Sequence, residues 1–556
     1  MNSNQITIYC ENNKMEKKYP FGTTLYDIYE DMQIYIGEEV LGAVVNNTLK
    51  ELDYMIYKPK VINFIGYSHP AGHRMYERSL SMVLFKVVYD LFPQYKLKIE
   101  HSVSGGLYCE LEGLKNKRSL QKIIRQLKAR MKEIIADDIP FEREELRTEK
   151  ALEIFEDFGL DDKCKLIRTR NQFFSSVYKL DNVVNYFYGF LIPSTGLLKR
   201  FDLTKYFNGM LLVLPSKINP DKFKNVVDKN KLFEIFQEFK EWVEIIGVPN
   251  VGTLNELVLA KKYGDIIKIS EALQEKKIAC IADSIQKSQS VKVVFISGPS
   301  SSGKTTFAKR LGIQLSVIGI KPTVISMDNY FVNRDQTPLD ENGEYDFESP
   351  EALDITLFNQ NILDLIAGKE IDVPGFSFTE GKRIYDGTKL KLNNNGIIIV
   401  EGIHGLNPDI SKSIPKEKKF KVYVSALTPI SFDSNNRIPT TDNRLLRRMV
   451  RDSRYRGYSA LETLQRWPAV RKGEEKHIFP FQEEADVMYN TALPYELGVL
   501  KHWAEPLLRD VPPNVPEYAE AKRLLKFLAY FKRIGTREIP PTSILREFLD
   551  GSSFRY

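Results

Sequence analysis

The sequence contains few cysteines, and their positions exclude the usual structural uses of this residue. Cys10, Cys109, Cys164 and Cys280 are spread over a chain of 556 residues without the close spacing of metal ligands. Isolated thiols of this kind are typical of a reducing compartment. The sequence therefore argues against a disulfide framework and against a cysteine-based zinc module.

An apolar run long enough to cross a bilayer is also missing. A membrane-spanning helix needs about 20 apolar residues in succession, and no stretch of the chain approaches that length. Residues 1–14 are polar and lack the apolar segment of a secretory signal. Internal repeats and low-complexity tracts are absent as well. With 43% hydrophobic and 27% charged residues, the composition is that of a soluble globular protein, which we expect in the cytoplasm.

The chain carries no strong charge of either sign. A net charge of +6 over 556 residues is a weak basic bias. Such a bias permits contact with phosphate-bearing ligands but does not by itself indicate nucleic-acid binding.

The chain is too long for a single hydrophobic core, and changes in pattern divide it. We expect a small α+β module, a second α+β unit, a helical linker rich in Lys and Glu, a region that alternates strand and helix, and a helical extension, at residues 1–66, 67–215, 216–288, 289–500 and 501–556 respectively. Alternation of strand and helix is typical of a doubly wound parallel sheet. The expected fold class is therefore a multidomain α/β protein with this sheet in its C-terminal half.

Hydrophobic periodicity places the main elements. It predicts helices at 24–32, 78–92 and 120–137, strands at 6–9, 41–45, 61–65 and within 97–109, and no strand between 220 and 288. Four strands are expected in the C-terminal half, at 291–297, 323–327, 396–400 and 420–425. Because ligands of an open parallel sheet bind beyond the carboxyl ends of the strands, residues that follow these strands are the first candidates for a site.

The clearest motif is a phosphate-binding loop. Residues 298–305 read Gly-Pro-Ser-Ser-Ser-Gly-Lys-Thr, which fits G-x-x-x-x-G-K-[ST], between an apolar strand and a segment with helical spacing. Glycines let the backbone wrap around phosphate, and successive N–H groups point inward at the helix N-terminus. A flexible linker is the alternative, but a linker requires neither the strand nor the helix. We expect phosphate contacts from Gly298, Ser300, Ser301, Ser302, Gly303, Lys304, Thr305 and Thr306.

Two of these residues have specific tasks, and two carboxylates end neighbouring strands. Lys304 would reach the β- and γ-phosphates of ATP, and the Thr305 hydroxyl would hold Mg²⁺. Asp328 is placed to serve an acceptor hydroxyl, and Glu401 to act on Mg²⁺ directly or through water. Either carboxylate alone could be a helix cap. Their convergence with the loop favours phosphoryl transfer.

Four arginines are predicted to share one face of a helix. Arg444, Arg447, Arg448 and Arg451 follow the i, i+3, i+4, i+7 spacing within residues 442–452. One interpretation is a solvated face paired with Asp442 and Asp452 at the ends of this segment. The other is a lid whose guanidinium groups clamp phosphates.

At this point the region from Val291 to about Val499 resembles the uridine kinase family of P-loop nucleoside kinases. The matching motifs are the phosphate loop, the arginine helix, Met327-Asp328-Asn329-Tyr330-Phe331, Asp346-Phe347-Glu348-Ser349-Pro350, Val373-Pro374-Gly375-Phe376-Ser377-Phe378, Val400-Glu401-Gly402-Ile403 and Ala485-Asp486-Val487. The resemblance implies ATP-dependent phosphorylation of a nucleoside 5′-hydroxyl, with a pyrimidine ribonucleoside as substrate. It covers about two fifths of the chain.

The resemblance also implies roles for individual residues. The aspartate matching Asp328 is the base toward the 5′-hydroxyl, and the acidic residue matching Glu348 binds ribose hydroxyls. Aromatic residues matching Phe347 and Phe376 line the base pocket, and arginines matching Arg444 and Arg447 belong to the lid. The implied catalytic set is Asp328, Lys304, Arg444 and Arg447, and the implied nucleoside-binding set is Asp328, Phe331, Phe347, Glu348, Phe376 and Arg444.

The chain departs from that family in the base pocket. Where the family has a tyrosine and a histidine, this sequence has Phe376 and Gly381. Phe376 offers a face for stacking but no polar group, and Gly381 leaves space. We therefore expect selection of the base mainly by shape, with tolerance of a larger base beside Gly381.

The N-terminal half resembles two modules found together in another enzyme. Residues 5–66 resemble a TGS domain, and residues 67–215 resemble the second, editing-type domain of threonyl-tRNA synthetase. The four polar positions of that domain are here Arg78, Met82, Phe187 and Leu191. Metal binding and deacylation need lone pairs and titratable groups. We therefore expect a retained scaffold that neither binds zinc nor hydrolyses mischarged tRNA.

Two features of the N-terminal half leave alternatives. His69 and His73 have metal-like spacing, but they are predicted to lie in a Pro/Gly loop before the helix, so a zinc site there is disfavoured. Nucleic acid is disfavoured as a partner, though a contact through the N-terminal half stays open. The sequence gives no oligomeric state.

Two other functions compete with the kinase. A GTPase is suggested because TGS modules accompany G domains, but no N-K-x-D motif is present and Glu401 stands where an aspartate is expected. A tRNA- or ribosome-associated regulator that uses ATP as a switch is favoured by the TGS-like module. It is disfavoured by Asp328 and the arginine helix, because a switch needs no base for an acceptor hydroxyl.

Overall fold

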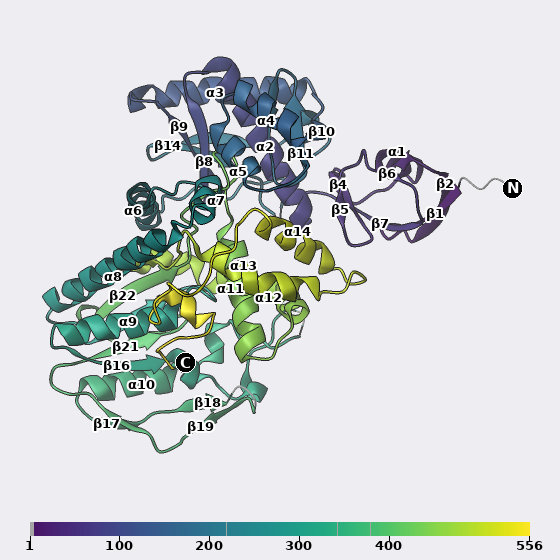
Figure 1. Cartoon of the computed structure of the whole chain (residues 1–556). Helices are drawn as coiled ribbons and strands as arrows, with labels where there is room; N and C mark the ends of the chain where they lie inside the picture. Colours follow the sequence, from purple (N-terminus) through teal and green to yellow (C-terminus); the bar gives the residue numbers. More distant parts are fainter. Residues whose placement is uncertain (1–4, 218, 342, 378–379, 556) are drawn as a thin grey trace.

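The computed structural model describes residues 5–217, 219–341, 343–377 and 380–555, which form a multidomain α/β protein. A small module at the N-terminal end is set apart from the rest of the molecule (Figure 1). In the same view, the second α+β unit lies above the C-terminal sheet. In the described ranges, none of the helices combines the length and apolar character needed to cross a membrane.

The N-terminal module is a five-stranded sheet with one helix. The strand order is β2-β1-β7-β4-β5, with β1 (Gln5–Cys10), β2 (Met15–Pro20), β4 (Gly42–Val45), β5 (Leu49–Lys50), β7 (Lys60–Ile65) and α1 (Leu25–Asp31). A short antiparallel pair is formed by β3 (Thr23–Thr24), directly before α1, and β6 (Met55–Ile56). Thr24 and Asp27 form a capping box, which starts α1 where the sequence predicts it. Asn46 and Asn47 both have positive φ, as a turn between strands requires.

The second unit packs two long helices and two sheets. Helices α2 (Pro70–Leu91) and α3 (Leu120–Ala136) cover the sheet β13-β14-β9-β8, formed by β8 (Lys96–Val103), β9 (Gly106–Glu112), β13 (Asp202–Tyr206) and β14 (Gly209–Val213). A second sheet, β10-β11-β12, comprises β10 (Glu142–Arg147), β11 (Phe174–Leu180) and β12 (Val183–Asn185). Helices α4 (Thr148–Asp157) and α5 (Asp161–Arg168) join β10 to β11.

Helix α2 begins eight residues before the predicted position 78. Pro70 occupies the first turn, where it has no partner to lose. The ring nitrogen Nδ1 of His69 caps the helix by accepting from the Ala71 N–H at 3.1 Å. Gly72 is required because a Cβ there would lie 1.9 Å from the Gly66 carbonyl oxygen. The expectation of a loop position is therefore right for His69, which precedes the helix and caps it, and wrong for His73, which lies in the first turn of α2.

Three helices connect the halves, and no strand occurs in the described residues between 220 and 288. They are α6 (Asn230–Ile246), α7 (Val251–Leu259) and α8 (Tyr263–Lys287). Gly247 ends α6 in the left-handed conformation, at φ +73°.

The C-terminal sheet is entirely parallel, in the order β16-β21-β15-β22-β23. The four predicted strands are present as β15 (Val293–Ser297), β16 (Lys321–Ser326), β21 (Gly396–Glu401) and β22 (Lys419–Ser425). The fifth strand, β23 (Val487–Asn490), was not predicted; its four residues are too few to show a period. Two hairpins lie beside the sheet, β17 (Glu370–Asp372) with β20 (Lys389–Lys391), and β18 (Gly375–Ser377) with β19 (Lys382–Ile384).

Helices cover both faces of this sheet, as the apolar strands require. Alternate residues of β15 separate the two faces: Val294 and Ile296 pack with α8 and α9 (Lys304–Val317), whereas Val293 and Phe295 pack with α10 (Ile355–Ile366). The remaining helices are α11 (Thr440–Tyr455), α12 (Ala460–His477), α13 (Glu496–Arg509) and α14 (Tyr518–Leu528). A one-turn helix, η8 (Ile544–Glu547), follows them near the C-terminal end (Figure 1).

The two halves share one hydrophobic core. Buried residues of α4, α5 and β11, together with Tyr186, belong to the same cluster as those of α8, α9 and α11. Between β22 and α11, residues 426–439 enter the second unit, where Asp433 forms a buried ion pair with Lys163 of α5. Asn435 Nδ2 donates to the Leu97 carbonyl at 3.1 Å, and Asn436 Nδ2 to the Tyr186 carbonyl at 2.9 Å. The segment that leads into α11 is therefore anchored in the N-terminal half.

Candidate active site

The phosphate loop connects β15 to α9. Gly298 lies so close to β22 that a Cβ would be 1.8 Å from the Val424 carbonyl oxygen. Gly303 is the N-cap of α9 and has φ +84°, which favours glycine. Both glycines of the motif are thus required by the backbone path. The N–H groups of the loop and of the first turn of α9 are the donors that the sequence predicts for phosphate.

Lys304, in the first turn of α9, is folded back onto the loop. Its ammonium donates to the carbonyl oxygens of Gly298 at 2.9 Å and Pro299 at 3.1 Å. Burial lowers the pKa of Lys304, while the nearby carboxylates of Glu401, Glu547 and Asp328 raise it. The lysine therefore stands at the centre of an acidic group of side chains.

Thr305 and Glu401 lie next to each other, as a shared metal would require. Thr305 Oγ1 is 3.5 Å from Glu401 Oε2, and Glu401 Oε1 accepts from Ser326 Oγ at 3.1 Å. Burial, followed by the charge of Asp328, raises the pKa of Glu401 to about 7. Hydroxyl and carboxylate oxygens suit Mg²⁺, which is held by one or two carboxylates together with substrate phosphates and water. In the described part of the chain, no group of three or more His, Cys, Asp or Glu side chains is arranged to hold a metal ion.

Asp328 follows β16, at the edge of the sheet that carries the loop. It lies in the short helix η3 (Met327–Tyr330), which Ser326 caps by accepting from the Asp328 N–H at 3.3 Å. Burial raises the pKa of the Asp328 carboxyl, and the charges of Lys304, Arg456 and Arg451 oppose that shift. The charges of Asp328, Lys304 and Glu401 therefore act on one another.

The nucleoside-binding candidates are only partly grouped. Glu348 lies against Gly473 of α12, and burial raises the pKa of its carboxyl to about 7. The rings of Phe331 and Phe376 are 5.6 Å apart between centroids. Phe347, in contrast, is 45% exposed, and its ring pairs with Tyr345. Phe378, part of a motif cited above, lies outside the described residues.

The position of Gly381 is not open space. Its φ is +67°, and a Cβ there would lie 2.7 Å from Nε and 2.9 Å from Cβ of Arg334. The Arg334 N–H also donates to the Gly381 carbonyl oxygen at 2.8 Å. The expectation of room for a larger base beside Gly381 is therefore wrong, because the Arg334 side chain fills that place.

The inner arginines of α11 are buried in ion pairs. Arg444 and Arg447 are 1% and 0% exposed. Arg444 Nη2 donates to Glu474 at 2.7 Å, and Arg447 Nε to Glu496 at 3.1 Å. Arg444 Nη1 also donates to the Ser300 carbonyl oxygen at 3.1 Å. In this conformation their guanidinium groups are engaged in ion pairs and, for Arg444, in a hydrogen bond to the loop backbone. Their role as phosphate clamps stays a prediction.

The outer arginines are more accessible. The side chains of Arg448 and Arg451 are 14% and 16% exposed, and both pair with Asp452. Arg448 Nη1 donates to Ser300 Oγ of the loop at 2.9 Å. Burial and the neighbouring Arg456 lower the pKa of Arg451 to about 10. Asp452 thus pairs as one interpretation predicted, whereas Asp442 instead binds Arg523.

Three acidic residues at the loop were not predicted. Glu474 accepts from the Ser300 N–H at 3.0 Å, Glu496 pairs with Arg447, and Glu547 accepts from Thr306. They are more than 160 residues from the loop in sequence, so no local spacing connects them to it.

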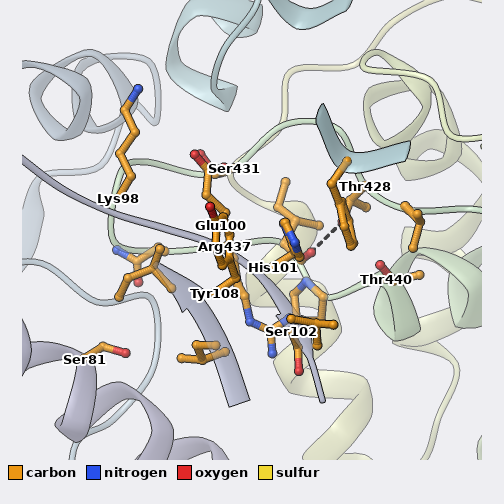
Figure 2. Close-up of a pocket in the computed structure, with 18 of the residues that line it drawn as sticks. Ser81, Lys98, Glu100, His101, Ser102, Tyr108, Thr428, Ser431, Arg437 and Thr440 are labelled. Carbon is orange, nitrogen blue, oxygen red and sulfur yellow. Dashed lines mark hydrogen bonds between the residues drawn. The ribbon is translucent and has the colours of Figure 1, made fainter. Parts of the chain in front are cut away.

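A cavity lies elsewhere, between the two halves. It measures about 1320 Å³ and reaches the loop only at Pro299. Figure 2 shows His101 and Tyr108 of the second unit facing it together with Thr428, Ser431 and Arg437 of the segment before α11. Lys304, Asp328, Glu348 and Glu401 are not among its lining residues. We place the chemistry at the loop, because that is where the lysine and carboxylates converge.

The four altered positions of the editing-like unit pack as core or structural residues. Met82, Phe187 and Leu191 are at most 2% exposed and belong to one hydrophobic cluster. Arg78 Nε donates to the Phe190 carbonyl oxygen at 3.0 Å, and its guanidinium lies 5.7 Å from the Tyr188 ring centroid. Absence of zinc binding and deacylation stays a prediction.

Residues 293–494 match the family described as the phosphoribulokinase / uridine kinase family. The chain is 31% identical over 179 residues to a uridine kinase of Schizosaccharomyces pombe, covering 32% of this chain and 35% of that protein. It is 28% identical over 199 residues to a threonine–tRNA ligase of Clostridium kluyveri, covering 36% and 31%. The threonine–tRNA ligase matches cover the N-terminal half. The chain thus spans about a third of the length of these curated relatives.

Among solved structures, two kinases each align with part of this chain. A possible uridine kinase from Bacillus stearothermophilus is 21% identical with a TM-score of 0.25, over 36% of this chain and 89% of that one. A putative fructose transport system kinase from Silicibacter sp. TM1040 is 18% identical with a TM-score of 0.29, over 38% and 98%. Residues 293–494 thus match the kinase family named above, and the N-terminal half is similar to threonine–tRNA ligases. The match supports a phosphotransferase.

Proposed function

We propose that the C-terminal region transfers the γ-phosphoryl group of ATP to the 5′-hydroxyl of a nucleoside, with a pyrimidine ribonucleoside as the substrate class. The observation that carries the proposal is the convergence of Asp328, Glu348 and Glu401 on Lys304, at the carboxyl ends of parallel strands that hold a phosphate loop. Such a crevice combines a phosphate cradle, a metal site and an acceptor base.

At the phosphate end, the loop N–H groups and Lys304 bind the transferring group. To bind the ligand, the Lys304 side chain must turn away from the carbonyl oxygens of Gly298 and Pro299. A negatively charged phosphate favours this change because it attracts the ammonium more strongly than a carbonyl oxygen does. Arg448 and Arg451 supply the mobile cations of the lid. Arg444 and Arg447 stabilise the conformation of the loop through hydrogen bonds to Ser300 and to the adjacent Thr491.

Thr305 and Glu401 would hold Mg²⁺, which when bound neutralises charge on the phosphates. Protonated Glu401 is a poor ligand. A divalent cation next to it favours the ionised form and counteracts the effect of burial on its pKa.

At the acceptor end, Asp328 takes the proton of the 5′-hydroxyl. The hydroxyl oxygen forms the new bond to the γ-phosphorus, the bond from that phosphorus to the bridging oxygen breaks, and ADP leaves. Burial raises the pKa of Asp328, which strengthens it as a base. Glu348 would bind ribose hydroxyls with charge-assisted hydrogen bonds, and Phe331 with Phe376 would stack on the base.

A screen of nucleosides with ATP tests the proposal. ATP consumption that requires a nucleoside, together with a nucleoside 5′-monophosphate as product, is the expected result. Consumption of GTP without an acceptor would indicate the GTPase alternative. Nucleotide binding without turnover of any nucleoside would favour an ATP switch that acts through the tRNA ligase-like half, to which the segment before α11 is anchored.

A further inference from the structure

A glutamate from the C-terminal end of the described chain lies on the first turn of α9. Glu547, at the end of η8, accepts two hydrogen bonds from Thr306 through Oε2: from the backbone N–H at 3.2 Å and from Oγ1 at 2.8 Å. Glu547 is only 8% exposed. More than 240 residues separate the two partners in sequence.

The contact is built into the fold. Ile544, Leu545, Phe548 and Leu549 around the glutamate are fully buried. Ile544 packs on the phosphate loop, since a Cβ on Gly303 would lie 2.6 Å from its Cγ2.

Hydrogen bonds fix the segment on both sides. Arg546 Nη2 donates to the carbonyl oxygens of Thr536 at 2.9 Å and Ile539 at 2.8 Å. The Tyr455 hydroxyl of α11 donates to the Leu549 carbonyl oxygen. The segment therefore joins the loop, α9 and the arginine helix.

The place that Glu547 occupies is one that suits a phosphate. Thr306 is the third residue of α9, and the first N–H groups of a helix point out of its N-terminal end. This end of a helix is positive and binds anions. In a phosphate loop, such N–H groups cradle the α- and β-phosphates of the nucleotide. A carboxylate bound to the Thr306 N–H and hydroxyl uses the same donors and adds a negative charge near Lys304.

We infer that Glu547 is an internal competitor for the nucleotide: its carboxylate holds the anion position at the start of α9, and nucleotide binding requires its displacement. This inference rests on the proposed function, because it takes the loop to bind nucleotide. The buried residues of the segment keep Glu547 next to the loop, so the carboxylate competes at a high effective concentration.

Nucleotide affinity tests the inference without any acceptor. ADP binding is measured by calorimetry on the full chain, on Glu547→Gln, which keeps the shape and removes the charge, and on Glu547→Ala. Glu538→Gln serves as the matched control, because it removes the same charge from the same end of the chain at a glutamate that pairs with Lys268. Both Glu547 variants should bind ADP about tenfold more tightly than wild type, as expected for removal of one charged hydrogen-bonding competitor, and the control should not change.

A second measurement uses the unaltered chain and so does not depend on variant folding. Saturation with ADP should speed amide hydrogen exchange over residues 543–550, because ligand and segment oppose each other reciprocally. Equal or weaker ADP affinity in both Glu547 variants, or slower exchange with ADP, would overturn the inference and leave the proposed function intact. Failure of wild type and variants alike to bind ADP would overturn both.

Discussion

Lys163 and Asp433 form an ion pair of 2.6 Å between Nζ and Oδ1, and both side chains are completely buried. They lie 270 residues apart, one on α5 of the second unit and the other in the segment between β22 and α11. Burial raises the pKa of Asp433 although the charge of Lys163 lowers it, so removing the pair from water has a large free-energy cost. It is completed by N–H groups of Asn435 and Asn436, at 2.9 and 3.0 Å from Asp433 Oδ1. The relationship fixes the entry to the arginine helix against the other half of the molecule.

Breaking this pair should destabilise the whole chain. Lys163→Met leaves Asp433 buried without its cation, and removal of one partner of a buried pair costs about 3–5 kcal/mol. Denaturant unfolding should show this loss, with the exposed Lys165→Met as the control. The double change Lys163→Met with Asp433→Asn should recover part of the stability. An unfolding free energy within about 1 kcal/mol of wild type for the single variant would mean that water or rearrangement satisfies Asp433.

Lys304→Ala and Asp328→Asn should each lower kcat for nucleoside phosphorylation by about 10²–10⁴-fold. The first removes charge stabilisation of the transferring phosphoryl group, and the second removes the proton acceptor. Asp328→Asn should keep ADP affinity, because its side chain is assigned to the acceptor. Asp335→Asn, an exposed position on the next loop, is the control. Phosphorylation by Asp328→Asn at a near wild-type rate would assign the base elsewhere.

Glu401→Gln should lower the activity and raise the free energy of unfolding at pH 8. The folded-state pKa of Glu401 is about 7, above that of an unfolded glutamate, so the folded protein holds the proton more tightly between those values. Ionisation of Glu401 therefore costs stability as pH rises through this window, and the full cost is present above pH 7. Glutamine never ionises, so without ligand the variant should be more stable than wild type at pH 8, by on the order of 2 kcal/mol, and similar at pH 5.

The same pKa predicts the pH dependence of wild-type activity. Because the ionised carboxylate is the form that binds the metal, kcat/KM should rise as pH increases through about 7 and reach a plateau above it. Thermal unfolding at pH 5 and pH 8, together with kcat/KM between pH 5.5 and 8.5, measures both effects. If Glu401→Gln were less stable than wild type at pH 8, Glu401 could not be a buried charge that destabilises the folded protein.

Substitutions of the arginines on α11 should have two different effects, one on stability and one on activity. Arg447→Ala leaves Glu496 buried and unpaired, so it should cost about 3–5 kcal/mol of stability. Arg451→Ala should leave stability within about 1 kcal/mol, since its side chain is partly exposed, but lower kcat by about 10²–10³-fold. Thermal unfolding and steady-state kinetics of the two variants, side by side, test this. The reverse pattern would return the clamp to the inner arginines.

Arg334 should influence which base is accepted. It occupies the place beside Gly381, a position that the resemblance assigns to the base pocket, where a donor could reach a pyrimidine carbonyl oxygen. Arg334→Met keeps much of the volume and removes the donors. The ratio of kcat/KM for uridine and cytidine should then move toward one, while the preference for ribose over 2′-deoxyribose stays. An unchanged ratio would mean that the base is chosen by shape alone, as the sequence suggested.

Local patterns predicted much of the C-terminal region. Four strands, the loop and the carboxylates at strand ends follow from periodicity and from a motif whose chemistry is known. The contacts around the loop could not be predicted, because Glu474, Glu496 and Glu547 reach it through the tertiary fold alone. Helix α2 was misplaced because Pro70 and Gly72 read as a loop, although proline is well suited to a first turn. Gly381 was misread because the sequence cannot show which neighbouring side chain fills the space of a missing one.

The hydrophobic core that passes from α4 and α5 through α8 to α9 has a consequence for where this protein can be cut. A fragment that begins at the family boundary, residue 293, would lose Ile267, Ile278 and Ile281, which are at most 2% exposed, and uncover the face of α9 on which α8 lies. The residues that match the kinase family therefore do not coincide with an independent folding unit. The second unit and the C-terminal region share this core, so they should unfold together in a single thermal transition.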